Sequence, residues 1–425
     1  MKAKTFFITA LSCTLLLLAG SAGLVAWVDP LLTARTLGEG ETALFVNERY
    51  EMAGLIRRQD YSNILMGTSL AANYRASWFT EGTGEKTLKI TFPDGRLSEF
   101  DTALDLAFRT HGELSRVFFC LDPNLLIRPD QGSELPEYLY NDNPVDDVQL
   151  YFNAESLALA VKSLILGEEA KTSLDEAYIW EGNTQFSIGD ALAGYPRPEP
   201  SGTVLPDDAY LATAEQSMDV VCGWAQAHPD TQFIIWYPPY SVLYWDQADR
   251  LGQTEAILHA LEYACGRLLA CENVRLSSFL NAQGTITDLN QYADHIHCST
   301  LVTRYEAEQV LAGEWTIWPQ FYQKQIDELR QFVTSYDYDG LFARYGWADG
   351  APSSAQAALI CSAVPPLPTK SDDFAGTPYH FIFLGEMNSP CENSPPAASN
   401  LRRIRAAPPT GGAQGGLAYG GFIYD

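Results

Sequence analysis

The chain has 425 residues, of which 46% are hydrophobic and 19% are charged, so it can build one large core or two domains. Its 27 basic and 53 acidic residues give a net charge of -26, which repels phosphate backbones and argues against nucleic acid as a partner. The same charge repels anionic lipid headgroups, so membrane association has to come from another feature.

The N-terminus supplies that feature. Residues 6–28 form an apolar stretch of roughly 20 residues, about one bilayer crossing, preceded by Lys2 and Lys4 and followed by Asp29. This pattern predicts that residues 1–30 are a single-pass transmembrane anchor in the cell membrane, with the N-terminus in the cytoplasm and the body outside. A cleaved signal peptide is the alternative, because residues 19–22 have the small side chains of a cleavage site.

Beyond a membrane-proximal connector with some helix at residues 31–60, strand-like runs alternate with helix-like runs. This alternation predicts an α/β fold for residues 61–342: a three-layer sandwich with a central parallel five-stranded sheet. Residues 167–206 are polar and rich in Gly and Pro, and we expect them to form an insertion or lid. The expected strands are 62–66, 87–92, 115–121, 232–236 and 273–278, and the expected helices are 100–110, 148–166, 209–227, 255–269 and 301–311.

The last part of the chain, residues 343–425, has a different composition. It contains several Pro-Pro pairs, a glycine-rich run and a cluster of arginines that reverses the acidic bias. Low complexity of this kind predicts a disordered tail outside the fold, and an out-of-frame origin for it stays open.

The cysteines and histidines do not predict a metal site. Cys265 and Cys271 are close in sequence, but both fall in or near one predicted helix, which leaves their ability to form a disulfide open. No CxxC motif or Cys/His set has zinc spacing, so we expect no structural metal and no cofactor.

Two short motifs carry the residue types of nucleophilic catalysis. Ser69 follows an apolar run and Gly67, and Asp294 lies three residues before His297. A serine hydroxyl is a poor nucleophile until a base takes its proton, and that base works best when a carboxylate fixes its tautomer. Ligands of parallel sheets bind beyond the carboxyl ends of the strands, and Ser69 follows one of the predicted strands.

Each motif also has a simpler structural interpretation. A serine such as Ser69 before a helix is commonly an N-cap, and Gly95 and Asp122 suit turns at strand ends. His295 and His297 could form a metal pair, because alternate residues of a strand share a face, but no further ligand set completes that site.

Taken together, the motifs resemble the SGNH (GDSL-like) hydrolase superfamily. Gly67-Thr68-Ser69 is similar to its first block, and Asp294-xx-His297 is similar to its last. The segment 288–299 and the Pro239-Tyr240-Ser241 run resemble membrane-anchored bacterial members that modify cell-envelope polymers. Those members include relatives of the lipoteichoic-acid D-alanyl-transfer protein and of alginate-type O-acetyltransferases, and the similarity covers residues 61–313.

The resemblance implies an SGNH/flavodoxin-like fold with Ser69 as nucleophile, His297 as base and Asp294 as its orienting carboxylate. It also implies an oxyanion hole at Gly95 and Asp122, together with the Ser69 N–H. At the Asp122 position the family has Asn, and a carboxylate donates a hydrogen bond only when protonated. Asn124 is the alternative donor to Asp122.

The implied function is that of an extracytoplasmic serine acyl-ester hydrolase or O-acyltransferase that acts on a cell-envelope polysaccharide or teichoic polymer. A multi-pass membrane O-acyltransferase is the implied partner that hands over the acyl group. The alternative is a catalytically inactive envelope-binding or scaffolding module that keeps the fold.

Overall fold

The computed structural model describes residues 3–38, 40–143, 145–184 and 186–345. Most of the predicted tail, from residue 346 on, therefore lies outside the described residues. The last described helix, α16 (Tyr338–Arg344), runs across the limit predicted at residue 342.

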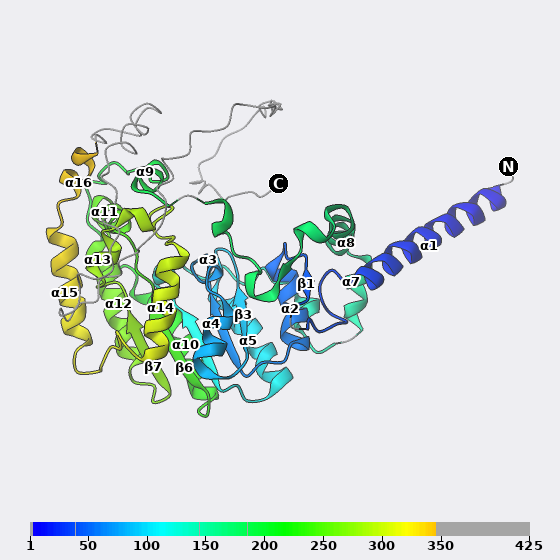
Figure 1. The fold of residues 1–425 in the computed structure, drawn as a ribbon, viewed down its shortest axis with the longest axis horizontal. Coiled ribbons are helices and arrows are strands. Elements are labelled where there is room, and N and C mark those ends of the chain that lie inside the picture. Colours follow the sequence, from blue (N-terminus) through cyan, green and yellow to red (C-terminus); the bar gives the residue numbers. More distant parts are fainter. Residues whose placement is uncertain (1–2, 39, 144, 185, 346–425) are drawn as a thin grey trace. The chain divides into compact units, whose positions relative to one another are not determined.

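The centre of the fold is a parallel sheet of five strands, ordered β3-β2-β4-β6-β7 (Figure 1). Every predicted strand is found within two residues of its expected limits, which confirms an α/β fold with a five-stranded parallel sheet. The strands are β2 (Asn63–Gly67), β3 (Thr87–Thr91), β4 (Arg116–Cys120), β6 (Gln232–Tyr237) and β7 (Val274–Ser278).

The strand order reverses at β2. The chain passes from β2 outward to β3, and then returns to the other side of β2 to form β4. In the register of these strands Gly67 lies opposite Cys120 on one side and Thr91 on the other. In open parallel sheets such a switch point opens a crevice beyond the carboxyl ends of the two strands beside it.

Four of the predicted helices are confirmed as single helices, and several others were not predicted. α2 packs against α5, α10 against α12, α4 against α14, and α12 against α15. The confirmed helices are α5 (Leu97–His111), α10 (Leu211–Ala227), α12 (Thr254–Leu268) and α14 (Thr300–Ala312). α2 (Glu48–Arg58) lies in the connector, where some helix was expected. The additional helices include α4 (Ala76–Thr83), α11 (Val242–Arg250) and α15 (Tyr322–Ser335).

The single helix predicted for residues 148–166 is wrong in one respect. The chain breaks at Asn153, which has an extended backbone and separates α7 (Gln149–Phe152) from α8 (Ala154–Leu166). The Asn153 side chain accepts a hydrogen bond from the N–H of Glu155 at 2.7 Å. Asparagine favours this N-cap role, so a helix begins here rather than continues.

The insertion at 167–206 contains little regular structure. Its strand β5 (Thr172–Ser173) pairs antiparallel with β1 (Thr42–Ala43) from the connector, and α9 (Ile188–Ala193) follows. Two-residue strands carry no periodic signal, which explains why the sequence did not reveal this pairing.

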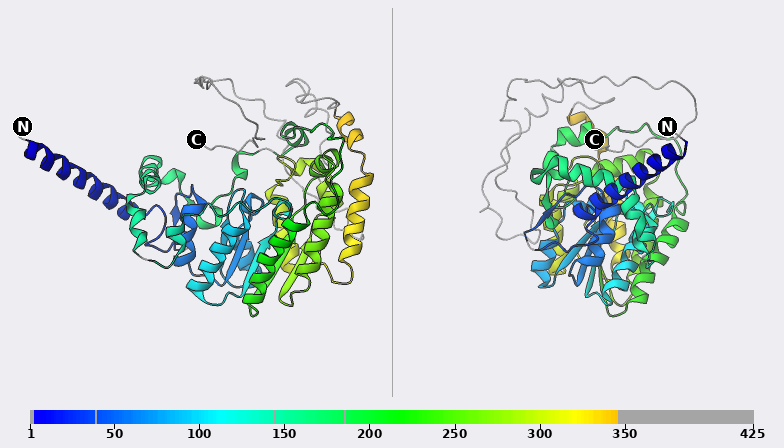
Figure 2. Two further views of the ribbon diagram at one scale, coloured as in Figure 1. Left: turned by 180° about the vertical axis from the view of Figure 1, so that it is seen from behind. Right: turned by 90° about the vertical axis from the view of Figure 1, so that its right-hand side faces the viewer.

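The N-terminal helix α1 (Ala3–Val28) has 26 residues and is long and apolar enough to cross a membrane. Figure 2 shows α1 as one continuous helix. Its residues 3–20 are exposed throughout, whereas Val25 is buried and Leu24 and Val28 pack against the core. α1 contacts α7 and α8. Insertion in a cell membrane, orientation and cleavage remain predictions.

Within the described residues, Cys265 and Cys271 are both free thiols, so the structure shows no disulfide between them.

Candidate active site

Ser69 lies where β2 meets the short helix α3 (Ser69–Ala72). Gly67 allows the close approach that this turn needs, because a Cβ there would lie 2.7 Å from the Ala71 Cβ and 2.9 Å from the Cys120 oxygen. Thr68 is the N-cap residue, but its hydroxyl makes no capping bond. It donates instead to Asp122 Oδ2 at 3.0 Å, which ties the start of α3 to the end of β4.

The buried side chain of Lys89 fixes the other end of α3. Its Nζ donates to the carbonyl oxygens of Ala72 at 2.8 Å and Tyr74 at 2.9 Å. Burial lowers the pKa of this ammonium to about 7, and Asp175 partly offsets that effect. A lysine in an apolar strand gave no sequence signal of this role, which depends on the sheet placing β3 beside β2.

Asp294 and His297 share a tight loop that precedes α14. The loop is closed by a bridge between Tyr292 and Cys298 and by a hydrogen bond from the Ala293 N–H to the His297 oxygen at 3.0 Å. Asp294 Oδ1 accepts the backbone N–H groups of Ile296 and His297, each at 2.8 Å. An aspartate side chain that accepts hydrogen bonds from the backbone two and three residues later stabilises a tight turn, which fixes the spacing of three residues between Asp294 and His297.

The structure brings Ser69, His297 and Asp294 together, although Ser69 is 228 residues from His297. The Ser69 Oγ lies 2.8 Å from His297 Nε2, and His297 Nδ1 lies 2.6 Å from Asp294 Oδ2. Both distances fall within roughly 2.6–3.2 Å, the reach that proton transfer requires. An ionised carboxylate only accepts hydrogen bonds, so Nδ1 carries the proton and Nε2 is left to accept from the serine hydroxyl.

The charges around the imidazole favour its role as a base. Burial lowers the pKa of His297, but the hydrogen bond and charge of Asp294, with a further contribution from Asp122, outweigh it and raise the pKa. Burial alone would raise the pKa of Asp294, but the hydrogen bond and charge of His297 hold it well below its usual range. Asp294 is therefore ionised at neutral pH and stabilises the protonated imidazole.

The Pro239-Tyr240-Ser241 run after β6 supports this loop. The Ser241 hydroxyl donates to the His295 oxygen at 2.7 Å, and the Tyr292 hydroxyl donates to the Pro239 oxygen at 2.8 Å. His295 itself is part of this loop, and burial lowers its pKa. In the described part of the chain no group of three His, Cys, Asp or Glu side chains is placed to hold a metal ion.

The structure does not present Gly95 or Asp122 as oxyanion donors. The Gly95 N–H donates to the Phe92 oxygen at 2.9 Å, within a turn. Asp122 accepts hydrogen bonds from Thr68, from the Asn124 N–H at 2.8 Å and from the Tyr240 hydroxyl. Burial raises the pKa of Asp122, and these donors and the nearby His297 oppose that rise.

Asn124, the alternative donor, also has a partner, because its Nδ2 donates to the Tyr240 hydroxyl at 3.0 Å. The remaining expected oxyanion donor is the backbone N–H of Ser69. Ser69 is the first residue of the helix α3.

Sequence reasoning missed Trp180, which the insertion brings to the site. Its Nε1 donates to the Ser69 backbone oxygen at 3.2 Å. Its ring meets the His297 ring edge-on, with the centroids 5.3 Å apart. The only sequence signal for Trp180 was that it is an aromatic residue in a polar, glycine-containing segment. Such a segment has no helical or strand periodicity from which the position of Trp180 could be predicted.

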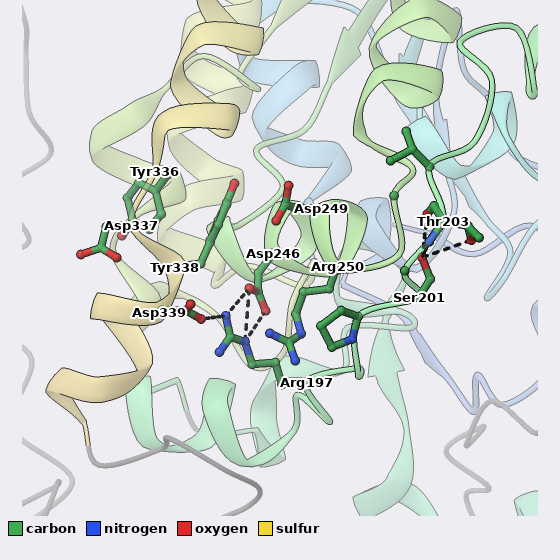
Figure 3. Close-up of a pocket in the computed structure, with 14 residues that line it drawn as sticks. Arg197, Ser201, Thr203, Asp246, Asp249, Arg250, Tyr336, Asp337, Tyr338 and Asp339 are labelled. Atoms are coloured by element: carbon green, nitrogen blue, oxygen red, sulfur yellow. Dashed lines mark hydrogen bonds and ion pairs between the residues drawn. The ribbon is translucent and has the colours of Figure 1, made fainter.

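A separate polar hollow of about 430 Å³ lies between the end of the insertion, α11 and α16 (Figure 3). Its lining includes Arg197, Asp246 and Arg250 but none of the three residues at the Ser69 site. Arg197 forms a bidentate pair with the buried Asp246, with nitrogen–oxygen distances of 2.8–3.2 Å, and a further bond to Asp339 at 2.7 Å.

No protein-family model matches this chain, and no curated protein matches it either.

Proposed function

We propose that the chain is a membrane-anchored serine acyl-ester hydrolase or O-acyltransferase of the cell envelope. The observation that carries the proposal is the continuous chain of hydrogen bonds from Ser69 Oγ through His297 to Asp294. A hydroxyl, an imidazole and a carboxylate in this order form the arrangement that activates a serine nucleophile, whatever the fold that holds it.

In the proposed reaction Ser69 Oγ attacks the acyl carbon while His297 Nε2 takes the hydroxyl proton. The bond to the alkoxy leaving group then breaks, and Nε2 returns the proton to that oxygen, which leaves the acyl group on Ser69. Water or a sugar hydroxyl repeats the two steps and releases the acyl group as an acid or as a new ester. Asp294 keeps the imidazole in the required tautomer throughout.

The finer fold proposal is a three-layer sandwich of the SGNH type. It is supported by the strand order of the five-stranded sheet and by the position of Ser69 and Asp122 after β2 and β4, on either side of the switch point. The resemblance of the Gly67-Thr68-Ser69 and Asp294-xx-His297 motifs to that superfamily points the same way.

The proposed substrate is an O-acylated cell-envelope polysaccharide or teichoic polymer, reached from a single-pass anchor with the body outside the cell membrane. The apolar helix α1 supports the anchor, and the motif resemblance supports the polymer class and a multi-pass membrane O-acyltransferase as partner. The acidic chain is a poor match for a nucleic acid.

The test is the release of nitrophenolate from p-nitrophenyl acetate by the full chain in detergent. We expect a burst of about one equivalent per chain as Ser69 is acylated, and no burst from Ser69→Ala. Ser187→Ala is the matched control, because Ser187 is also half-buried and also begins a helix, but has an aspartate rather than an imidazole at its hydroxyl. A burst that survives in Ser69→Ala, or that is absent from the unmodified chain, contradicts the proposal.

A second candidate is a catalytically inactive module that binds or scaffolds envelope polymer. The observation in its favour is that the Gly95 N–H and the Asp122 carboxylate are already engaged in internal hydrogen bonds. One oxyanion donor is worth roughly 3–4 kcal/mol of transition-state stabilisation, so a site that lacks these donors loses much of its rate. Polymer binding without acylation of Ser69 would identify this candidate.

A further inference from the structure

Exposed apolar side chains gather on one part of the surface beside α1. Outside α1, seven large apolar residues with exposed side chains lie between residues 145 and 166, and four lie elsewhere in the described chain. The first group comprises Val145, Val148, Phe152, Val161, Leu164, Ile165 and Leu166. We call the exposed apolar surface of α7 and α8 the α8 face.

α8 is apolar on both of its sides. Its buried residues are Leu159, Ala160 and the small Ser156, and α8 contacts α1 and α7. On the opposite side Ala154, Ala158, Val161 and Ile165 are exposed, at the spacing of one helix face. A helix on the surface of a soluble domain carries polar residues on that side, whereas a helix that is apolar all round is covered by protein or lipid.

α15 shows the usual arrangement in the same molecule. Its buried residues are Ile326, Leu329 and Val333, and every exposed position of the helix is polar. The exposed apolar residues of α8 are therefore not a general property of the surface helices of this protein.

The position of α1 indicates what covers the α8 face. At about 1.5 Å per residue α1 is about 39 Å long, and a hydrocarbon core of about 30 Å takes up roughly its first 20 residues. The next residues, around Val25, are the ones that pack against the body, and α1 contacts α7 and α8 (Figure 1). An anchor inserted in this way brings the α8 face to the boundary of the bilayer.

We propose that the α8 face inserts into the outer part of the lipid bilayer, beside α1, and holds the body against the membrane. The inference rests on the membrane anchor of the proposed function, but not on its chemistry. α8 carries only Glu155 and Lys162 as charged residues, and the chain as a whole is strongly acidic, so the attachment is apolar rather than electrostatic.

The test is photocrosslinking of the full chain in phosphatidylcholine nanodiscs that contain an alkyne-tagged phosphatidylcholine. A benzophenone amino acid replaces one residue at a time, at position 15 in α1, 165 in α8 or 204 in the insertion. Ile165 and Val204 form a matched pair, because they are 76% and 78% exposed. Cooperative thermal unfolding of each variant, at the midpoint of the unmodified chain, checks that its body is folded.

We expect lipid adducts at positions 15 and 165 and only background at 204, with no loss of the adduct at 165 in high salt. Adducts at 15 but not at 165 would overturn the inference and leave the anchor intact. An absence of lipid adducts at both position 15 and position 165 would overturn the membrane anchor as well. The nitrophenolate burst described above tests the proposed chemistry separately. A protein adduct at 165, to a second copy or within the chain, would also contradict lipid as the occupant.

Discussion

Two carboxylates in this protein differ in burial and in partner: Asp246 is fully buried, whereas the side chain of Asp294 is partly exposed. Asp246 lies in the large hollow and is paired with Arg197, whereas Asp294 is paired with His297 beside Ser69. A guanidinium keeps its proton at any physiological pH, so the first pair is fixed. An imidazole gains and loses a proton near neutral pH, so the second pair can move one. The difference teaches that the partner of a carboxylate, rather than the size of the hollow beside it, decides whether the pair can move a proton.

The largest expected effect comes from Asp294→Asn. The amide preserves the shape of the side chain but no longer requires the proton on Nδ1, so Nε2 is not held as the acceptor of the Ser69 proton. We expect kcat for ester hydrolysis to fall about 10⁴-fold. Steady-state kinetics checks this, and a change of less than tenfold would contradict the assigned role.

The matched change in the other pair, Asp246→Asn, is expected to affect stability instead. It leaves the Arg197 guanidinium without its buried partner, and breaking such a pair typically costs about 3–5 kcal/mol. Urea unfolding of the two variants and the unmodified chain measures the difference, with kcat/KM of the folded protein expected to be unchanged. Loss of activity without loss of stability would overturn the distinction between the two regions.

The pH profile sharpens the same contrast. The base must be neutral, and Asp294 raises the pKa of His297 above its ordinary value. Activity should therefore rise with pH through an inflection above the usual range of histidine and be lost as the pH falls through it. In Asp294→Asn the residual activity should inflect at a lower pH, because burial of the imidazole is then opposed only by the charge of Asp122. If the inflection lies at the same pH in Asp294→Asn and in the unmodified chain, the effect of Asp294 on the pKa of His297 is contradicted.

The smallest expected effect comes from Trp180→Phe. The change removes the hydrogen bond to the Ser69 carbonyl and keeps an aromatic ring against His297. A lost hydrogen bond of about 0.5–1.5 kcal/mol corresponds to a roughly three- to tenfold lower kcat/KM. Trp224→Phe is the control, since Trp224 in α10 loses a similar bond to Asp101 in α5 and the change should leave kcat/KM unchanged.

The sheet was predictable from the sequence because each of its strands is a short apolar run between turn residues. β2, β3, β4, β6 and β7 lie within two residues of their expected limits. Ser69, Asp294 and His297 were predictable because each motif is local. The break at Asn153 was missed because one capping residue interrupts an otherwise helical pattern.

The environment of the site was not predictable from the sequence. The role of Trp180 depends on how the insertion folds back over α3, and that of Lys89 depends on strand pairing. Gly95 and Asp122 were chosen by alignment with motif blocks, which do not reveal that the Gly95 N–H and the Asp122 oxygens have internal partners. Long-range contacts of this kind carry no periodic or spacing signal.

Covalent labelling with a fluorophosphonate, followed by mass spectrometry of the peptides, tests the central claim most directly. If the imidazole activates the hydroxyl, the phosphonyl group is expected on Ser69 of the full chain, at a rate that falls steeply in His297→Ala. A peptide that stays unmodified, or a label on any other serine, would contradict the account.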